Sequence, residues 1–365
     1  MLKFFCQFVL MACLPFSGAV HAAKVLFLNP GKANETFWVS YSQFMQTAAN
    51  ELGLELQIQY GQRIPERSIM QAREALQGPD RPDYLVFTNE QYIAPQILRL
   101  SQGSGVKLFI VNNPLSSEQA SRIGAQAAKV SGLIGSMATN DEEGGYLMLK
   151  ELLRQHGPLK PDQTLGLLAF SGVKNTPASI LREKGMQRAL KEHPQVRLRQ
   201  KVYGQWSQQR AYDQALKLFK RYPGTKLVWA ANDEMAFGAM RAASETGRIP
   251  GRDVLFSAVN SSIPALEARM DGRLSALVAG HFTLGGWAMV LLSDDSKGID
   301  TARYGGRDRL VPVLQLIEPE QAGHLLQAAH QNGIPLTFAD YSAQGKPPSY
   351  RYPFSIQTVL QVLAP

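Results

Sequence analysis

Carboxylates and histidines are the side chains from which metal or acid–base chemistry is built, and this sequence offers three weak candidates for it. The run Asp141-Glu142-Glu143 is typical of the first turn of a helix, where the helix dipole favours negative charge. His324 and His330 are six residues apart, a spacing that does not place two ligands on one helix face. Asp294-Asp295-Ser296-Lys297-Gly298 is a poor calcium loop, because Lys297 replaces a ligand oxygen. We therefore expect no metal site and no cofactor.

Motifs for nucleotide binding and covalent catalysis are also missing. The turn after the first predicted strand reads Asn29-Pro30-Gly31-Lys32-Ala33-Asn34, which is not the G-x-G-x-x-G of a dinucleotide site. Neither the phosphate-binding loop G-x-x-x-x-G-K-[ST] nor the nucleophile elbow G-x-S-x-G occurs in the sequence. Without a nucleophile–base pair, the chain is not expected to be an enzyme.

Polar residues of a binding site would have to be positioned by an alternation of apolar strands and amphipathic helices. The helix that begins near Phe37 and ends at Gly53 shows the helical spacing of apolar residues most clearly. Buried strands that alternate with helices predict an α/β fold with parallel sheets covered on both faces. Strands are expected at 24–29, 54–60, 83–88, 106–111, 133–135, 164–170, 196–203, 227–231 and 254–259. Further helices are expected at 68–76, 95–101, 140–156, 178–191, 207–220, 235–245 and 263–270.

Three local expectations accompany this pattern. Asn140 is expected to cap the helix that follows it, with Glu143 as its partner three residues on. Residues 294–309 are polar and glycine-rich and show no regular pattern. The tail at 341–352 contains prolines and is expected to wrap the surface.

Length and composition favour two globular domains. The chain has 365 residues, of which 45% are hydrophobic and 19% charged, and a domain holds about 150 residues. The formal charge of +8 is distributed along the sequence, whereas nucleic-acid-binding proteins concentrate positive charge on one arm or helix. We therefore expect no nucleic-acid partner.

Residues 1–23 have the features of an export signal. Lys3 precedes an apolar stretch from Phe4 to Phe16, and Val20-His21-Ala22 places small residues at a cleavage site near Ala22/Ala23. A buried strand or a membrane anchor is the alternative, but the run is shorter than the roughly 20 residues that cross a bilayer. Both cysteines lie within this segment, so lipidation at Cys13 remains a minority interpretation. The mature chain is expected in the periplasm.

Several phrases of the sequence, in their order and spacing, resemble the periplasmic sugar-binding proteins of the ribose and galactose type. The resemblance covers residues 24 to 320, and the Asn-Asp-Glu-Met-Ala phrase is its most specific part. The phrases are Phe37-Trp38-Val39-Ser40, Ala138-Thr139-Asn140-Asp141-Glu142-Glu143-Gly144-Gly145, Arg182-Glu183-Lys184-Gly185-Met186, Ala231-Asn232-Asp233-Glu234-Met235-Ala236-Phe237-Gly238-Ala239 and Phe256-Ser257-Ala258-Val259-Asn260.

The resemblance implies a type I periplasmic binding protein, an α/β fold of two doubly wound parallel-sheet lobes joined by a three-stranded hinge. Chain crossings would lie near 138–139, 280–281 and 311–316. The N-terminal lobe would comprise 24–138 plus 281–312, and the C-terminal lobe 139–280 plus 313–365. A ligand would bind between the lobes at the carboxyl ends of the strands.

The resemblance also implies a set of ligand-binding residues. Aromatic rings there offer apolar area to the C–H faces of a sugar, an arginine can bind neighbouring oxygens with its fork, and an amide both donates and accepts. Positions in the core or on a solvated helix face are the alternatives for the aromatic residues and the arginine, and Asp233 is expected to cap its helix. The assigned residues are Phe37, Trp38, Asn112, Thr139, Arg182, Trp206, Asn232, Asn260 and His281.

Departures from the family pattern bear on the ligand. The fourth strand of such proteins usually ends in an aspartate, and another follows the late strand; here Asn112 and Asn260 stand in these places. A glutamine near the third site is displaced by Gly280, with His281 beside it. Because two carboxylates are lost beside Arg182, we expect a neutral or positive pocket and a sugar acid, a lactone or a furanosyl signal as the ligand.

The predicted function is that of a periplasmic receptor, a monomer, which delivers its small polar ligand to an inner-membrane ABC permease. The alternative is a ligand-sensing subunit of a membrane sensor such as a histidine kinase. A transcriptional regulator shares this type of core but needs about 60 further residues for its helix-turn-helix, and the export signal occupies that place. An enzyme on the same fold lacks a recognisable catalytic group.

Overall fold

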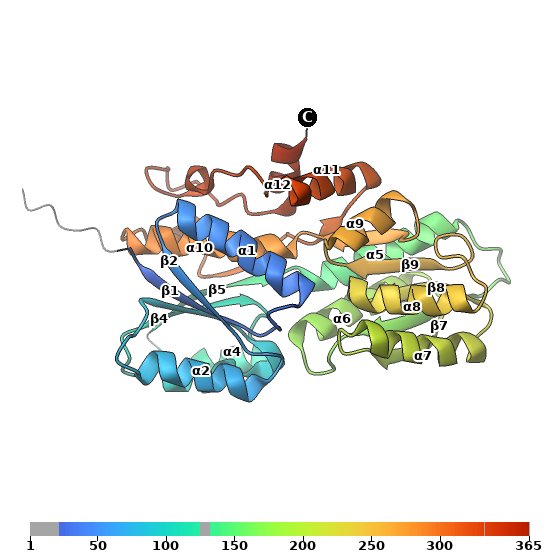
Figure 1. The fold of residues 1–365 in the computed structure, drawn as a ribbon, viewed down its shortest axis with the longest axis horizontal. Helices are drawn as coiled ribbons and strands as arrows, with labels where there is room; N and C mark the ends of the chain where they lie inside the picture. The colour runs from blue at the N-terminus through green and yellow to red at the C-terminus, as the bar shows by residue number, and fades with distance from the viewer. Residues whose placement is uncertain (1–21, 125–131, 332, 365) are drawn as a thin grey trace, which may run out of the picture.

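The computed structural model describes residues 22–124, 132–331 and 333–364, and most of the predicted export signal, Cys13 included, lies outside them. Two six-stranded sheets form its frame, one in each lobe (Figure 1). The first has the order β11 (Asp308–Val311), β5 (Leu133–Thr139), β4 (Lys107–Asn112), β3 (Tyr84–Thr88), β1 (Lys24–Asn29) and β2 (Glu55–Tyr60). The second has the order β12 (Gln315–Leu316), β10 (Ala276–Ala279), β9 (Leu255–Val259), β8 (Thr225–Ala230), β6 (Leu165–Ser171) and β7 (Val196–Tyr203).

Helices cover both faces of the N-terminal lobe, which is built on the first sheet. Figure 1 shows α1 (Thr36–Glu51) and α10 (Leu284–Ser296) above the sheet, with α2 (Pro65–Gln77) and α4 (Ser117–Gly124) below it. The short α3 (Ala94–Leu100) packs against α2. Because both faces are covered, the central strands are apolar throughout, as the fully buried residues of β3 illustrate.

The C-terminal lobe repeats this architecture on the second sheet. Its helices are α5 (Asp141–His156), α6 (Pro177–Glu192), α7 (Gln208–Arg221), α8 (Asp233–Glu245) and α9 (Ile263–Met270). Every strand pair in the two sheets is parallel except that of β10 with β12. The predicted fold class is therefore confirmed.

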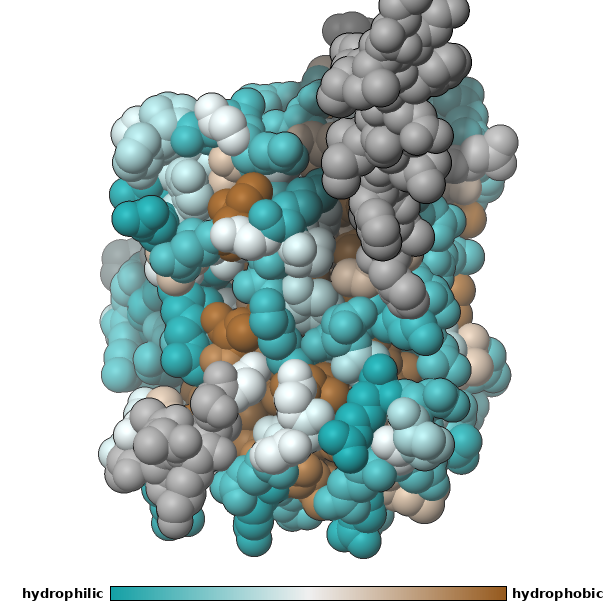
Figure 2. All heavy atoms as spheres, turned by 90° about the vertical axis from the view of Figure 1, so that its left-hand side faces the viewer, coloured by the Kyte–Doolittle hydropathy of each residue, from teal (hydrophilic) through white to brown (hydrophobic). Residues whose placement is uncertain are grey.

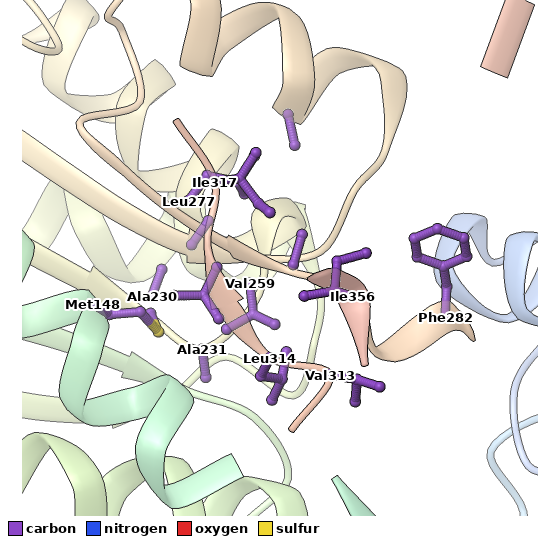
Figure 3. Close-up of a cluster of buried hydrophobic side chains, with 14 of the residues drawn as sticks. Met148, Ala230, Ala231, Val259, Leu277, Phe282, Val313, Leu314, Ile317 and Ile356 are labelled. Carbon is purple, nitrogen blue, oxygen red and sulfur yellow. The ribbon is translucent and has the colours of Figure 1, made fainter. Parts of the chain in front are cut away.

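The chain passes between the two sheets at three places. β5 leads into α5, β10 leads into the 3-10 turn at His281–Thr283, and β11 leads into β12. Figure 3 shows Leu314 of the third crossing close to Ala231 and Val259 at the strand ends of the C-terminal lobe, with Val313 on its other side. Asn140 is the N-cap residue of α5, as expected, but its side chain makes no capping hydrogen bond, because its amide instead pairs with both backbone groups of Leu314, at 2.8 and 2.9 Å. Asn140 thereby joins two of the crossings.

The C-terminal tail lies across both lobes, as the red segment of Figure 1 shows. α11 (Pro319–His330) and α12 (Ile356–Leu363) pack on the side of the C-terminal lobe, where α11 contacts α9. Between them, residues 338–354 pack on α10 of the N-terminal lobe, where Trp287 lies within 6 Å of the rings of Phe338 and Phe354. The sequence assigns all of 313–365 to the C-terminal lobe. It could not show that apolar residues of the tail complete the core around Trp287.

Most predicted elements end within a few residues of their observed bounds, and the larger differences have local causes. β5 extends to Thr139 because it pairs with β11, a strand that begins at the end of the segment that showed no regular pattern. α2 begins at Pro65, a residue type favoured in the first turn of a helix. The elements that the sequence did not predict are α4, β10, α10, β11, β12, α11 and α12.

The outer face of the N-terminal lobe is mainly polar. Figure 2 shows hydrophilic side chains over most of this end of the molecule, away from the grey atoms, with the apolar ones in small separate patches. None of the helices in the described residues is long and apolar enough to span a bilayer.

Substitution of Gly280 is expected to be costly because the first residue after β10 meets a neighbouring crossing. Its φ is 123°, and a Cβ atom there would lie 2.0 Å from the backbone oxygen of Val313. Gly272 also has a positive φ but has open space around it. We expect Gly272→Ala to cost about 1–2 kcal/mol of unfolding free energy from backbone strain alone. Gly280→Ala should cost a further 1–3 kcal/mol, roughly, measured by urea denaturation. Equal losses in the two variants would contradict this packing.

Candidate functional site

A cavity lies between the lobes at the carboxyl ends of the strands, where polar and aromatic side chains of both lobes converge. Ligand sites of α/β proteins occur at this edge of the sheet. Eight of the nine predicted site residues line it, and Thr139 does not. The lining consists of Glu35, Phe37, Trp38, Arg63, Glu90, Asn112, Asn113, Thr176, Ala178, Arg182, Trp206, Asn232, Asn260 and His281.

The first turn of α1 supplies the aromatic wall of the N-terminal lobe. The Phe37 ring stacks on His281 with ring centroids 4.2 Å apart, and it meets Trp38 edge-on at 4.8 Å. Trp38 packs so closely on Gly31 that a Cβ there would lie 2.1 Å from its ring. Gly31, in the turn that had been examined for a dinucleotide motif, therefore makes room for a tryptophan.

The C-terminal lobe supplies an aromatic ring and two amides from three strand ends. Trp206 follows β7, lies against Gly172, and has the Arg182 guanidinium 5.8 Å from its ring centroid. Asn232 follows β8 and caps α8 by accepting a hydrogen bond from the Met235 backbone at 3.0 Å. Asn260 follows β9 with a φ of 133°.

The expectation that Asp233 caps α8 is wrong, since Asn232 takes that role. The buried Asp233 carboxylate instead accepts hydrogen bonds from the Asn260 amide at 2.6 Å and from the Ser262 hydroxyl at 2.5 Å. Burial raises the pKa of Asp233, and the hydrogen bonds from Ser262 and Asn260 oppose that rise. The Asp233 side chain, which was expected to cap α8, therefore holds Asn260 of the cavity.

Thr139 lies one layer behind the cavity. Its hydroxyl donates to the carboxylate of Asp141, and the other oxygen of that carboxylate binds Arg182 Nε at 2.6 Å. Thr139 therefore reaches the cavity only through Asp141 and Arg182, and its predicted contact with the ligand stays a prediction. Arg182 Nη1 also donates to the backbone oxygen of Ala231 at 2.6 Å, so two nitrogens of its guanidinium are bound by the protein.

Arg63 is the second arginine of the cavity, and its charge, like that of Arg182, is paired with carboxylates. It binds Glu35 through two nitrogens and Glu90 at 3.2 Å. The Glu90 carboxylate also accepts hydrogen bonds from Asn113 Nδ2 at 2.8 Å and, across the cleft, from the Thr176 hydroxyl at 3.4 Å. Burial raises the pKa of Glu90, against the opposing effects of Arg63 and Asn113. The two glutamates and two arginines of the lining balance in formal charge.

Comparisons with known proteins agree with this architecture. Residues 25–296 match the family described as periplasmic binding protein domain. A periplasmic sugar-binding protein from Pseudomonas fluorescens is 59% identical and superposes with a TM-score of 0.87, over 93% of this chain and 99% of that one. The chain belongs to the periplasmic binding protein family.

Two other relatives of this periplasmic binding protein are more distant. The galactofuranose-binding protein YtfQ of Escherichia coli is 27% identical over 115 residues, which span 31% of this chain and only 36% of that relative. The binding component of the arabinose ABC transporter from Shewanella sp. ANA-3, bound to L-arabinofuranose, is 22% identical over 85% of this chain and 96% of that one. Its TM-score of 0.69 shows that the two share the fold.

The sequence interpretation of this periplasmic binding protein missed Glu35, Arg63, Glu90, Asn113 and the two residues at the start of α6, Thr176 and Ala178. A signal for Arg63 was present, because Gly61-Gln62-Arg63 after β2 repeats the pattern of Gly204-Gln205-Trp206 after β7. The last two residues of each triplet have positive φ, between 54° and 63°. No comparable pattern marks Glu35 or Glu90, which are recognised only through their contacts with Arg63.

Five polar atoms of the lining are buried and lack a hydrogen-bond partner. Two are indole donors, Trp38 Nε1 and Trp206 Nε1, and two are amide acceptors, Asn112 Oδ1 and Asn113 Oδ1. The fifth is His281 Nδ1. Buried polar groups are normally paired, so these atoms are free to bind a polar molecule in the cavity. Within the described residues, no group of three or more histidine, cysteine, aspartate or glutamate side chains is arranged to hold a metal ion.

Gly172 tests how tightly the wall of the cavity is packed. A Cβ at this position would lie 2.1 Å from the Trp206 ring, whereas a Cβ at Gly224 would meet nothing within 4 Å. We expect Gly172→Ala to displace the indole, shift the tryptophan emission and lower the unfolding free energy by about 1–3 kcal/mol. Gly224→Ala should change both quantities little. If the emission spectrum of Gly172→Ala matches that of the unsubstituted protein, the indole does not occupy this place.

His281 should make stability fall on the acid side of neutrality. Burial, assisted by the Arg182 charge, lowers its pKa well below the usual 6.5. Its neutral ring is therefore fully favourable above pH 6.5, and stability is lost as pH falls because the unfolded chain takes up the proton. Unfolding free energy below about pH 6 should depend more steeply on pH than in His281→Gln, by up to about 1.4 kcal/mol per pH unit. Parallel curves for the two proteins between pH 7.5 and 5 would refute this.

Proposed function

We propose that this chain is a non-catalytic periplasmic receptor that closes its two lobes on a neutral cyclic sugar and delivers it to an ABC permease. The nine residues predicted as its site, with Thr139 acting through Asp141 and Arg182, belong to this proposal together with Arg63, Glu35, Glu90 and Asn113. The export signal at 1–23 would bring the chain to the compartment in which its family works.

The unpaired polar atoms of the cavity carry this proposal. A hydroxyl group donates and accepts hydrogen bonds, so a polyhydroxylated ligand can satisfy the two indole donors and the two asparagine acceptors together. A carboxylate only accepts and would leave both amide oxygens unpaired. Unpaired buried acceptors cost about 1–3 kcal/mol each.

The charges of the lining argue in the same direction. Arg63 is bound by Glu35 and Glu90, and Arg182 by Asp141. No arginine of the lining is therefore left without a counter-ion to attract an acidic ligand. We therefore favour a neutral ligand over the sugar acid that the loss of two aspartates suggested. The carboxylates that pair with the arginines could not be recognised in the sequence.

The relatives support a sugar in its furanose form. The galactofuranose-binding protein and the structure with bound arabinofuranose share the family or the fold with this chain. We propose a pentose or hexose furanose as the ligand class. The same transporter component supports delivery to an ABC permease rather than to a sensor.

Closure is proposed to depend on contacts that the ligand makes with both lobes. Phe37 and Trp38 belong to one lobe, and Trp206 and Asn232 to the other, so only the closed form presents them together. The lobes also meet directly, where Asn175 donates to Gln91 at 3.3 Å beside the Thr176–Glu90 contact.

Calorimetry with neutral and acidic sugars tests this function. We expect L-arabinose, D-galactose or D-ribose to bind more tightly than the uronic acids, with a change in tryptophan emission from Trp38 and Trp206. Trp206→Ala should weaken binding roughly 10- to 100-fold, since stacking area and one hydrogen bond are lost. The control Tyr222→Ala removes an aromatic ring of the same lobe outside the cavity and should bind normally. Tightest binding of an acid, or full affinity in Trp206→Ala, would overturn the assignment.

A further inference from the structure

Two buried carboxylates each hold an asparagine of the cavity, one in each lobe. Glu90 accepts from Asn113 Nδ2 at 2.8 Å, and Asp233 accepts from Asn260 Nδ2 at 2.6 Å. Both residues are less than 5% exposed, and Glu90 lines the cavity beside Asn113, whereas Asp233 lies outside the lining. Glu90 lies in the 3-10 turn after β3, whereas Asp233 is the first residue of α8, so the two lobes reach the same pairing by different routes.

The chemistry of the pair fixes which end of each amide turns inward. An ionised carboxylate only accepts hydrogen bonds, so it binds the amide nitrogen and never the amide oxygen. Because the carboxylate holds the amide nitrogen, the amide oxygen is the atom left to face the cavity. Asn113 Oδ1 is indeed buried without a partner, and Asn260 lines the same cavity.

We propose that Glu90 and Asp233 are positioning residues that make Asn113 and Asn260 act as acceptors for ligand hydroxyl groups, a role that rests on the proposed function. In both lobes an amide oxygen is presented to the ligand as an acceptor. The negative charge beside it is paired with Arg63 at Glu90 and lies outside the cavity lining at Asp233. The site therefore selects ligands whose hydroxyl groups donate hydrogen bonds to these two amide oxygens, and it rejects ligands that lack a donor at those positions.

Each carboxylate is anchored by further groups that keep it in place. Glu90 is bound by Arg63 and by the Thr176 hydroxyl. Asp233 is bound by the Ser262 hydroxyl and by the Glu234 backbone at 2.9 Å. An amide substituted for either carboxylate could donate as well as accept. The side-chain amide of Asn113 or Asn260 could then rotate and present its nitrogen to the cavity instead of its oxygen.

Sugars fluorinated at single positions provide the test, because fluorine cannot donate a hydrogen bond. The probe is whichever of L-arabinose, D-galactose and D-ribose binds best, together with each of its monodeoxyfluoro derivatives. The unsubstituted protein should prefer the parent sugar about 100-fold over at least one derivative, as for a lost buried hydrogen bond to an acceptor. Glu90→Gln and Asp233→Asn should each reduce such a preference at least tenfold, at different positions of the sugar.

Asp294→Asn is the matched control. Asp294 is also a buried carboxylate that accepts side-chain hydrogen bonds, but from Ser342 and Tyr352, and none of these three residues lines the cavity. Its variant should leave the preferences unchanged. If Glu90→Gln and Asp233→Asn weaken the parent and fluorinated sugars by the same factor, the carboxylates are merely structural and the proposal is wrong.

A swapped pair keeps the test decisive where a single variant folds poorly. In Glu90→Gln/Asn113→Asp and in Asp233→Asn/Asn260→Asp the amide and the carboxylate exchange places, so position 113 or 260 again presents an acceptor to the cavity. Both double variants should recover the preference for the parent sugar, and failure of both to do so contradicts the proposal. Absence of any sugar binding in the unsubstituted protein would instead refute the proposed function, and this inference with it.

Discussion

Burying charge in a closed cleft is expensive unless each charge has a partner, and the lobes meet this constraint separately. Arg63 pairs with Glu35 and Glu90 inside the N-terminal lobe, and Arg182 pairs with Asp141 inside the C-terminal lobe. Among the described residues, no ion pair joins one lobe to the other. Opening the cleft therefore leaves no charge unpaired, and closing it gains little by itself. The ligand is left to supply the difference between the two states.

Two turns with the same backbone conformation, one in each lobe, each supply a wall of the cavity. After β2 and after β7 the chain forms the same turn, in which the glycine N–H bonds the last residue of the neighbouring strand at 2.7 Å in both cases. The third position carries Arg63 in one lobe and Trp206 in the other. Because the backbone is shared, the lobes differ in the chemistry they present rather than in shape. A polar and an aromatic surface then face a single ligand, which suits a sugar with its hydroxyl rim and apolar faces.

How far the sequence predicts this site depends on whether a residue acts through its own type or through its neighbours. Apolar strands between amphipathic helices were sufficient for the fold class, and the aromatic and amide positions came from short phrases in the sequence. Glu35 and Glu90 could not be recognised, because a glutamate becomes part of the site only when Arg63 folds between them. The orientation of the Asn113 and Asn260 amides is likewise invisible in the sequence. The sequence left a neutral and a positive pocket open for this reason: residues far apart in sequence supply the negative charge that balances the two arginines.

The tail adds contacts between the lobes without opposing their motion, because of where it crosses. Residues 338–354 are fixed on the N-terminal lobe by Trp287 and by Asp294, which accepts from Ser342 and Tyr352. The chain then returns to the C-terminal lobe at Ile356, which lies close to Gly280 and, in Figure 3, near Val313. This return is therefore beside the three crossings, where a rotation about the hinge displaces atoms least. A tail attached at the outer ends of the lobes would resist the same rotation, so its position allows stabilisation of both cores and hinge motion together.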